Sequence, residues 1–497
     1  MKYRVIRSVA ALLVASLMVA ACGTRLPDSA FEQASSGQVQ AGNSDRNDNS
    51  GADDLGGDDL ALGGDTATGT GAGSGPATGG GGPSTRGIKP GGGADNAPNA
   101  ASEVGVTATT ITLGTIVAEN GVLGDAFAPA ARGIRAWAAA TNAAGGIRGR
   151  KVILKTCDDR EDRNRTLQCA QQLVERDKVF ALVSTNTRSF GGAAQYLADR
   201  SIPVVGFPIT NSFYRYPTFF SAYGHGYPRD GKNVGVNGQL LYSTGIYRWF
   251  KQNVGVTKAA VFFYDVDESK QAGEGFAKGM KLEGFEVTQY AVSFAAPSFD
   301  QAVAQMQRDG TQLILDAMDD GANRKLCDAM ERRKFSVKAK VSTIVSMGEA
   351  VGNNYNDTCR NVVYVPGQTI NYQQTAVPEV AKFRQAYKRY QPGIPLHQWA
   401  LESWMMARMV EEYVNRAAPT RKGLVDYLNG LTDYTGNGLD VGLDWGKPSG
   451  SGGRTKDCFT IARWQDSAGG WTSAANKFPF CYPDAFQYPT PALEQGN

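Results

Sequence analysis

Histidines and closely spaced cysteine pairs are scarce in this chain. Its 497 residues contain 2 histidines, His225 and His397, and its 7 cysteines include no Cys-x-x-Cys pair. A zinc site, which is usually built from such ligands, is therefore not expected, and we expect no other metal and no cofactor. The Gly-x-Ser-x-Gly elbow of many hydrolases is also missing. A formal net charge of only +3 does not favour nucleic-acid binding.

The one long apolar run covers residues 9–21 and follows a basic start of Lys2, Arg4 and Arg7. It is too short to cross a bilayer and has the position of a secretory signal. The run ends in Val19-Ala20-Ala21-Cys22-Gly23, which resembles the lipobox of bacterial lipoproteins. This resemblance implies that residues 1–21 are a signal peptide and that Cys22 carries a lipid anchor. The alternative is an ordinary signal peptide with a chance cysteine.

Large apolar side chains are nearly absent from residues 24–101, which are mainly Gly, Ser, Asp, Asn, Ala and Thr. Such a segment cannot bury enough apolar surface to offset the entropy lost on ordering. We therefore predict that residues 22–103 comprise the lipidated cysteine and a disordered tether. The rest of the chain is long enough for two lobes, each with its own core.

Short apolar runs alternate with amphipathic stretches along the remaining sequence. Candidate strands at residues 110–117, 151–155 and 179–183 are each followed by a candidate helix, and the rhythm restarts at residues 259–264. Continuous apolar strands between helices indicate parallel sheets with both faces covered. The predicted fold class is α/β, with two doubly wound parallel-sheet lobes joined by a hinge.

We assign the first part of lobe 1 to residues 104–223 and the main part of lobe 2 to residues 224–366. Residues 367–497 should supply the crossover, the remainder of lobe 1 and the C-terminal part of lobe 2. Residues 234–250 are expected to form a helix, and residues 459–471 a hairpin. Open α/β sheets bind ligands beyond the carboxyl ends of their strands, so two facing lobes predict a ligand cleft.

An even number of cysteines remains once Cys22 is set aside, which indicates disulfides in an exported chain. Six cysteines allow 15 pairings, and the sequence alone does not choose among them. Our hypothesis pairs sequence neighbours: Cys157 with Cys169, Cys327 with Cys359, and Cys458 with Cys481.

A distinctive motif lies at residues 141–152, with the sequence Thr-Asn-Ala-Ala-Gly-Gly-Ile-Arg-Gly-Arg-Lys-Val, preceded by Gly-Ile-Arg-Ala-Trp at residues 133–137. Together with Asp158-Asp159 and the strands near 179–183 and 202–205, it resembles type I periplasmic binding proteins of the branched-chain amino acid group. The resemblance runs from about residue 106 to the C-terminus and is strongest in the first lobe. It implies a two-lobed solute receptor and not an enzyme.

The resemblance also implies a ligand site. In the family, loops after the third and fourth strands hold the ligand carboxylate, and these loops correspond to residues 184–189 and 206–212. The candidates are therefore Arg188, Ser189, Thr210 and Asn211, since Arg can clamp a carboxylate and hydroxyls can donate to it. A solvated Arg188 and a helix-capping Ser189 are the alternatives.

The second lobe of the family offers an acidic residue to the ligand ammonium, and Glu349 matches that segment. Its alternative role is to open the following helix. Two family aromatics are missing, because Ala272 replaces a tyrosine and residues 317–320 contain no aromatic side chain. Asp319 and Asp320 are expected mainly to cap the following helix, and the alternative is that they add negative charge to the cleft. An ordinary branched-chain amino acid is therefore not the expected ligand.

Taken together, the sequence predicts a membrane-anchored extracytoplasmic receptor that captures a small polar ligand for an ABC importer. The ligand is an amino acid, an amide or a related compound, and the expected protein partner is the transporter permease. A monomer is expected. One alternative is a receptor that signals to a membrane partner without transport, and another is an exported enzyme on the same scaffold.

Overall fold

The computed structural model describes residues 99–497 except 225–226, 417, 446–457, 475–478, 484, 486 and 492–497. The signal peptide, Cys22, most of the predicted tether and His225 lie outside the described residues. All described residues belong to the second of two units, which runs from Thr85 to Asn497. No helix among the described residues is both long and apolar enough to cross a membrane.

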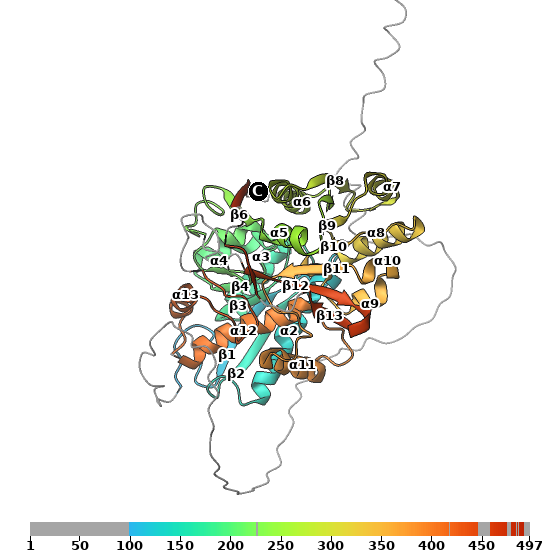
Figure 1. The fold of residues 1–497 in the computed structure, drawn as a ribbon. Helices are drawn as coiled ribbons and strands as arrows, with labels where there is room; N and C mark the ends of the chain where they lie inside the picture. The colour runs from blue at the N-terminus through green and yellow to red at the C-terminus, as the bar shows by residue number, and fades with distance from the viewer. Residues whose placement is uncertain are drawn as a thin grey trace, which may run out of the picture. The chain divides into compact units, whose positions relative to one another are not determined.

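The first sheet has five parallel strands in the order β2-β1-β3-β4-β5 (Figure 1). Its central strand β3 is buried along its whole length, as expected for an apolar strand between two helical layers. The strands are β1 Thr110–Ile116, β2 Lys151–Cys157, β3 Ala181–Thr185, β4 Val204–Gly206 and β5 Phe219–Ser221. The helices between them are α2 Gly124–Ala143, α3 Arg163–Gln171 and α4 Gly191–Asp199.

The glycine motif forms the turn between α2 and β2. Gly145 and Gly146 have φ values of 99° and 78°, a region that side chains with a Cβ disfavour. A Cβ on Gly146 would also collide with the carbonyl oxygen of Arg150. Asn142 of the motif accepts from and donates to the backbone of Val152, at 2.7 and 2.9 Å, and so fixes the turn to the strand.

The second sheet combines parallel strands with an antiparallel edge in the order β13-β12-β11-β10-β9-β7-β8. The parallel strands are β7 Lys258–Tyr264, β8 Glu286–Val292, β9 Leu313–Ala317, β10 Ala339–Val341 and β11 Val363–Gly367. Strand β12 (Cys458–Gln465) pairs antiparallel with β11, β13 (Gly470–Ser473) and β14 (Phe480–Cys481). The helices are α5 Gly245–Asn253, α6 Asp267–Leu282, α7 Asp300–Asp309, α8 Asp320–Arg332, α9 Ala350–Asn354 and α10 Asp357–Arg360. The two-sheet α/β prediction and the hairpin at residues 459–471 are confirmed.

After β11 the chain returns to the first sheet with α11 (Pro378–Tyr390), α12 (Gln398–Arg416) and α13 (Arg421–Asn429). Helix α12 packs against α2, β3 and β4 (Figure 1). The helices approach closely at Gly133, where any Cβ would collide with the backbone of Ala400. The hydroxyl of Ser184 in β3 donates to that of Ser403 in α12 at 2.6 Å. The chain then crosses back to complete the second sheet with β12.

The helix predicted for residues 234–250 is wrong in its first half. Residues Gln239–Ser243 form strand β6, which pairs antiparallel with β15 (Gln487–Pro491) near the chain end. Gly235 and Gly238 have φ values of 64° and 75°, which a continuous helix does not accommodate. The pairing partner lies about half the chain away, so local periodicity did not reveal it.

Three disulfides join the cysteines in sequence order. They link Cys157 to Cys169, Cys327 to Cys359, and Cys458 to Cys481. These are the neighbouring pairs of the sequence hypothesis. The first joins β2 to α3, the second joins α8 to α10, and the third ties β12 to β14.

Candidate functional site

A polar cavity of about 460 Å³ lies where α2 of the first lobe faces the loops after β9 and β10 of the second. Helix α2 contributes Arg132 to its wall, and the loops contribute Asp319 and Ser346. The segment before α12 closes it with Leu396 and His397. The cavity thus lies beyond the carboxyl ends of parallel strands, where open α/β sheets bind their ligands.

Both signs of charge line this cavity. Arg132 and Arg324 supply positive charge, and Asp125, Asp319, Asp320 and Glu349 supply negative charge. Within the described part of the chain, neither arginine has a hydrogen bond or ion pair to another residue. Arg132 is partly buried, so its guanidinium is a positive group held near the cavity without a protein carboxylate to neutralise it.

Glu349 is fixed at the wall of the cavity. Its backbone N–H donates to the carbonyl of Leu396 at 3.0 Å, and the N–H of Leu396 donates to its Oε2 at 3.0 Å. It occupies the N-cap position of α9, yet its side chain makes no capping hydrogen bond there. The sequence prediction placed Glu349 at a ligand site, and its position at this cavity agrees with that role without testing it.

The two aspartates after β9 differ: Asp319 is held by hydrogen bonds, whereas the buried Oδ1 of Asp320 has no hydrogen-bond partner among the described residues. Asp319 caps α8 by accepting from the N–H of Ala322 at 3.1 Å, as the sequence predicted. Its other oxygen accepts from the hydroxyl of Tyr264. Burial raises the pKa of Asp320, an effect opposed by the nearby Tyr355 and Asn354. Both carboxyl groups lie on the second-lobe wall of the cavity.

His397 is held in one tautomer. Its Nε2 donates to the carbonyl of Val345 at 3.0 Å, and its Nδ1 accepts from the N–H of Trp399 at 3.2 Å. Burial lowers the pKa of its imidazole to about 4, with the charge of Arg132 adding to the effect. His397 is therefore a neutral wall of the cavity at pH 7.

Arg188 and Ser189 lie in the loop after β3 but do not line the polar cavity. The Nε of Arg188 donates to Oε2 of Glu161 at 2.7 Å, and its guanidinium carbon lies 5.7 Å from the ring centre of Phe294 in the second lobe. Ser189 is buried and donates to the carbonyl of Glu161 at 2.5 Å. Its hydroxyl does not cap α4, whose N-cap is Phe190.

Thr210 and Asn211 lie in the loop after β4 and are also absent from the cavity wall. The Thr210 hydroxyl is buried and shares a 2.6 Å hydrogen bond with that of Ser212. Asn211 donates to Oε1 of Gln271 in α6 at 3.2 Å, which connects the two lobes. The loops that the sequence singled out thus face the second lobe, and their ligand role stays a prediction.

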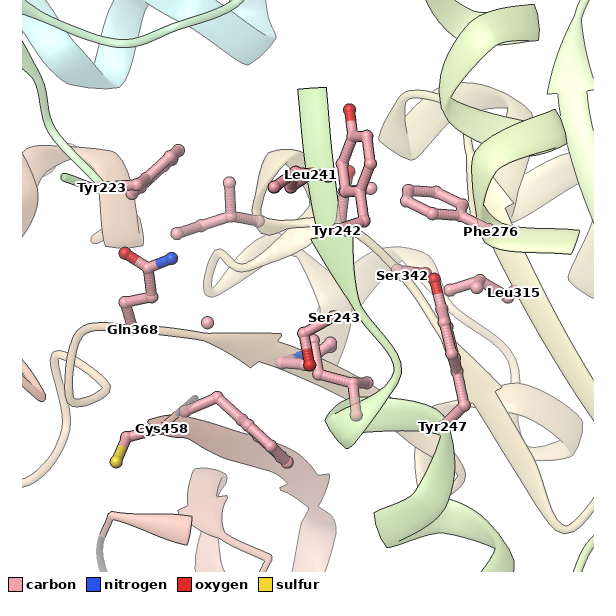
Figure 2. Close-up of a pocket in the computed structure, with 16 residues that line it drawn as sticks. Tyr223, Leu241, Tyr242, Ser243, Tyr247, Phe276, Leu315, Ser342, Gln368 and Cys458 are labelled. Carbon is pink, nitrogen blue, oxygen red and sulfur yellow. The ribbon is translucent and has the colours of Figure 1, made fainter. Parts of the chain in front are cut away.

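A second, apolar pocket of about 300 Å³ was not predicted. Figure 2 shows Tyr223 and Gln368 on one side of it and Tyr242 and Phe276 on the other. It lies beside β6 and α5, at the ends of β10 and β11. Its lining residues come from distant parts of the chain, so no local motif could have revealed it.

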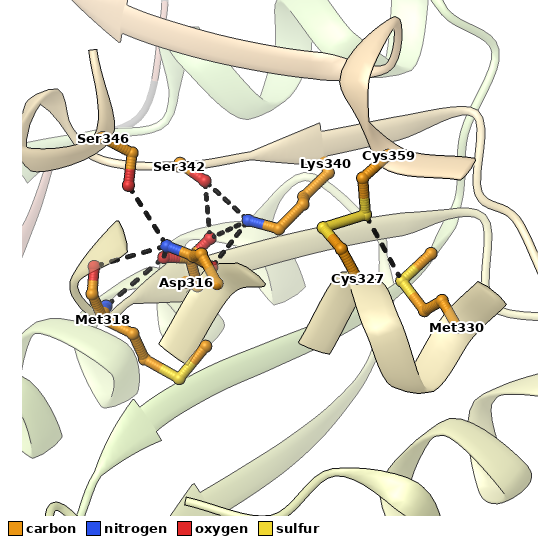
Figure 3. Close-up of polar contacts among 9 residues, drawn as sticks. Asp316, Met318, Cys327, Met330, Lys340, Ser342, Ser346 and Cys359 are labelled. Carbon is orange, nitrogen blue, oxygen red and sulfur yellow. Dashed lines mark hydrogen bonds and ion pairs between the residues drawn. A yellow bond between two sulfur atoms is a disulfide. The ribbon is translucent and has the colours of Figure 1, made fainter. Parts of the chain in front are cut away.

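A buried ion pair links β9 and β10 (Figure 3). Lys340 and Asp316 are fully buried, with Nζ and Oδ2 2.8 Å apart. Lys340 also donates to Asn323 at 2.6 Å and to Ser342 at 2.7 Å, so its three N–H groups are all used. In the sequence, the signal was a single charged residue inside each of two short apolar strands, Asp316 in β9 and Lys340 in β10.

A buried carboxylic acid lies where the chain passes between the lobes. Glu402 of α12 accepts from the hydroxyl of Thr369 at 2.6 Å and from that of Tyr223 at 3.2 Å. Tyr223 follows β5 and Thr369 follows β11, so both partners belong to crossover segments. Burial raises the pKa of Glu402 to about 8. The acid is therefore largely protonated at neutral pH.

Known proteins share this architecture. A fatty acid ABC transporter substrate-binding protein from Thermomonospora curvata matches with a TM-score of 0.61 and 14% identity, over 78% of this chain and 95% of its own. A branched-chain amino acid transporter substrate-binding protein from Streptococcus pneumoniae, in complex with isoleucine, matches with a TM-score of 0.57 and 14% identity, over 75% and 99%. A putative branched-chain amino acid ABC transporter protein from Rhodospirillum rubrum gives 0.53 and 18%, over 73% and 99%. No curated protein sequence matches significantly.

At these identities the structural matches establish the fold. The family assignment comes from the sequence profile described as periplasmic binding protein, which matches residues 110–470 and so covers well over half of the chain. Members of this family bind substrates and are not enzymes, in agreement with the sequence prediction. The chain belongs to the periplasmic binding protein family.

Proposed function

We propose that the protein captures a small solute with a carboxylate and an ammonium group, such as an amino acid or an amide derivative, for an ABC importer. The observation that carries this proposal is the polar cavity, where Arg132 of the first lobe, which has no hydrogen bond or ion pair among the described residues, lies across from Glu349 of the second lobe. A zwitterion satisfies both kinds of wall at once. Isoleucine and fatty acids, named for two of the structural neighbours, both carry a carboxylate.

In this mechanism Arg132 of the first lobe binds the carboxylate through charge-assisted hydrogen bonds. Glu349 of the second lobe accepts from the ammonium group with the oxygen that Leu396 leaves open. Since the two residues belong to different lobes, a bound solute favours the closed arrangement by its differential affinity. Arg188, Ser189, Thr210 and Asn211 are proposed to line the remainder of the inter-lobe face.

Titration of the purified protein with a panel of amino acids, amides and short organic acids tests this function. The first hit should then bind the R132A and E349A variants roughly 10- to 100-fold more weakly, the effect of losing one charge-assisted hydrogen bond. R333A is the matched control, because Arg333 is exposed at the end of α8 and does not line the cavity. Unchanged affinity in both variants, or chemical turnover of the ligand, would contradict the proposal.

The protein is further proposed to be a monomer held at the extracytoplasmic membrane face by lipid on Cys22, and to deliver its solute to a permease. The lipobox resemblance supports the anchor, and the transporter descriptions of the structural neighbours support the permease. Replacing Cys22 with serine should move the protein from the membrane fraction to the soluble fraction. A receptor that signals without transport remains the alternative, and loss of solute uptake on deletion of the protein separates the two.

A further inference from the structure

The apolar pocket offers no partner for a charged ligand. None of the 16 residues that line it is acidic or basic, in contrast to the polar cavity. An ionised group placed there would lose its hydration without gaining an opposite charge, which costs several kcal/mol in a protein interior. The chemistry of the walls therefore selects an uncharged molecule.

The two ends of the pocket differ in polarity. Figure 2 shows Phe276, Leu315 and Tyr247 together at one end and Gln368 at the other. The Oε1 of Gln368 is buried and has no hydrogen-bond partner among the described residues. The lining hydroxyl of Ser342 is already bonded to Asp316 and Lys340. Gln368 thus offers a buried acceptor that a ligand can satisfy, and satisfying a buried acceptor is favourable.

The pocket is built from elements that hold its shape. Cys458 lies in its wall and is bonded to Cys481. Strand β6 forms another wall and is supported by β15, whose Tyr488 donates to the carbonyl of Gly275 at 2.9 Å. Fixed walls reduce the entropy that a ligand must overcome on binding. A volume of about 300 Å³ holds roughly ten non-hydrogen atoms if each takes about 30 Å³.

We propose that this pocket is a binding site for an uncharged, mainly apolar small molecule with a terminal hydroxyl, such as a medium-chain alcohol. The apolar chain lies against Phe276, Tyr247 and Leu315, and the hydroxyl hydrogen-bonds to Gln368. This site goes beyond the proposed capture of a polar solute and does not depend on it. No residue lines both this pocket and the polar cavity.

Calorimetric titration of the purified protein with 1-octanol and with octanoate at pH 8 tests the proposal. 1-Octanol should bind at least tenfold more tightly than octanoate, because no cation lines the pocket. F276A should weaken octanol binding about tenfold by removing apolar contact, and Q368L should do so by removing the hydroxyl partner. L282A on the same helix α6 is the control, because Leu282 is exposed and lies outside the pocket.

Three outcomes would overturn the assignment: no octanol binding up to its solubility limit, octanoate binding as tightly as octanol, or wild-type octanol affinity in both F276A and Q368L. Melting temperatures without ligand verify that each variant is folded. R132A and E349A should bind octanol like the wild type. Failure of the polar-solute function therefore appears as loss of the amino acid signal alone, while failure of this site appears as loss of the octanol signal alone.

Discussion

Replacing Glu402 with glutamine should remove a pH dependence from the stability of the protein. The acid is fully buried, and its pKa is raised to about 8 by burial, against hydrogen bonds from Thr369 and Tyr223 that favour the ionised form. In the unfolded chain a glutamate titrates near pH 4.3. Between these two values the folded protein keeps a proton that the unfolded chain releases. The free energy of unfolding therefore falls as pH rises, and the fall ends above pH 8.

The best window for the measurement lies between pH 6.5 and 8. Below it, His397 acts in the opposite direction, because its pKa is about 4 in the folded protein and 6.5 in a free histidine. Inside the window His397 is neutral in the folded protein, while in the unfolded chain it loses its remaining proton, about half of the molecules being protonated at pH 6.5; this contribution is the same for the wild type and E402Q. Within the window, unfolding releases close to one proton from Glu402. The free energy of unfolding therefore falls by roughly 1.5 kcal/mol as the pH rises through these 1.5 units.

Urea denaturation of the wild type and of E402Q at several pH values across the window provides the assay. Titration of other groups is common to both proteins, so the difference between their curves isolates Glu402. E331Q, a change at an exposed position on α8, should retain the wild-type slope. Parallel curves for the wild type and E402Q would refute the argument that this acid is protonated in the folded protein.

Three further predictions concern stability. K340M leaves the carboxylate of Asp316 buried without its cation and should lower the free energy of unfolding by about 3–5 kcal/mol in urea denaturation, whereas the double variant D316L/K340M should recover much of the loss. Removing the 32-residue link with C327S/C359S should cost about 3 kcal/mol, and reducing agent should then have less effect than on the wild type. G133A should destabilise the protein by about 1–3 kcal/mol, because the added methyl collides with the backbone of α12; an unchanged melting temperature would contradict this.

Local patterns predicted the framework of the fold because the forces behind them are local. The short apolar strands specify buried parallel sheets, and Gly145 and Gly146 specify the turn after α2 through their positive φ values. The β6 strand escaped prediction because its partner β15 lies about half the chain away in the sequence. A strand that depends on a distant partner leaves too weak a periodic signal to separate it from the helix that follows.

The candidate site was predictable only in part for a related reason. Glu349 could be located because its segment resembles the part of the family's second lobe that offers an acidic residue to the ligand ammonium. Arg132 was missed because it lies inside a long amphipathic helix, where an arginine is usually a solvated surface residue. Its importance depends on the loops of the second lobe that face it, and no sequence period encodes that approach. Gln368 was missed similarly, because its unsatisfied carbonyl is a property of the assembled pocket.

The turn at Ile344–Ser346 separates the two cavities, with Ile344 lining the apolar pocket and Ser346 lining the polar one. Two ligands communicate through such a turn only if it has two arrangements of similar energy. Here Ser346 accepts from Asn323 at 3.2 Å, and Asn323 in turn accepts from Lys340. Moving the turn would break hydrogen bonds in a buried, charged network, which is costly. We therefore expect the affinity for an amino acid to be the same with and without saturating 1-octanol, and a change greater than threefold would show that this network has a second arrangement.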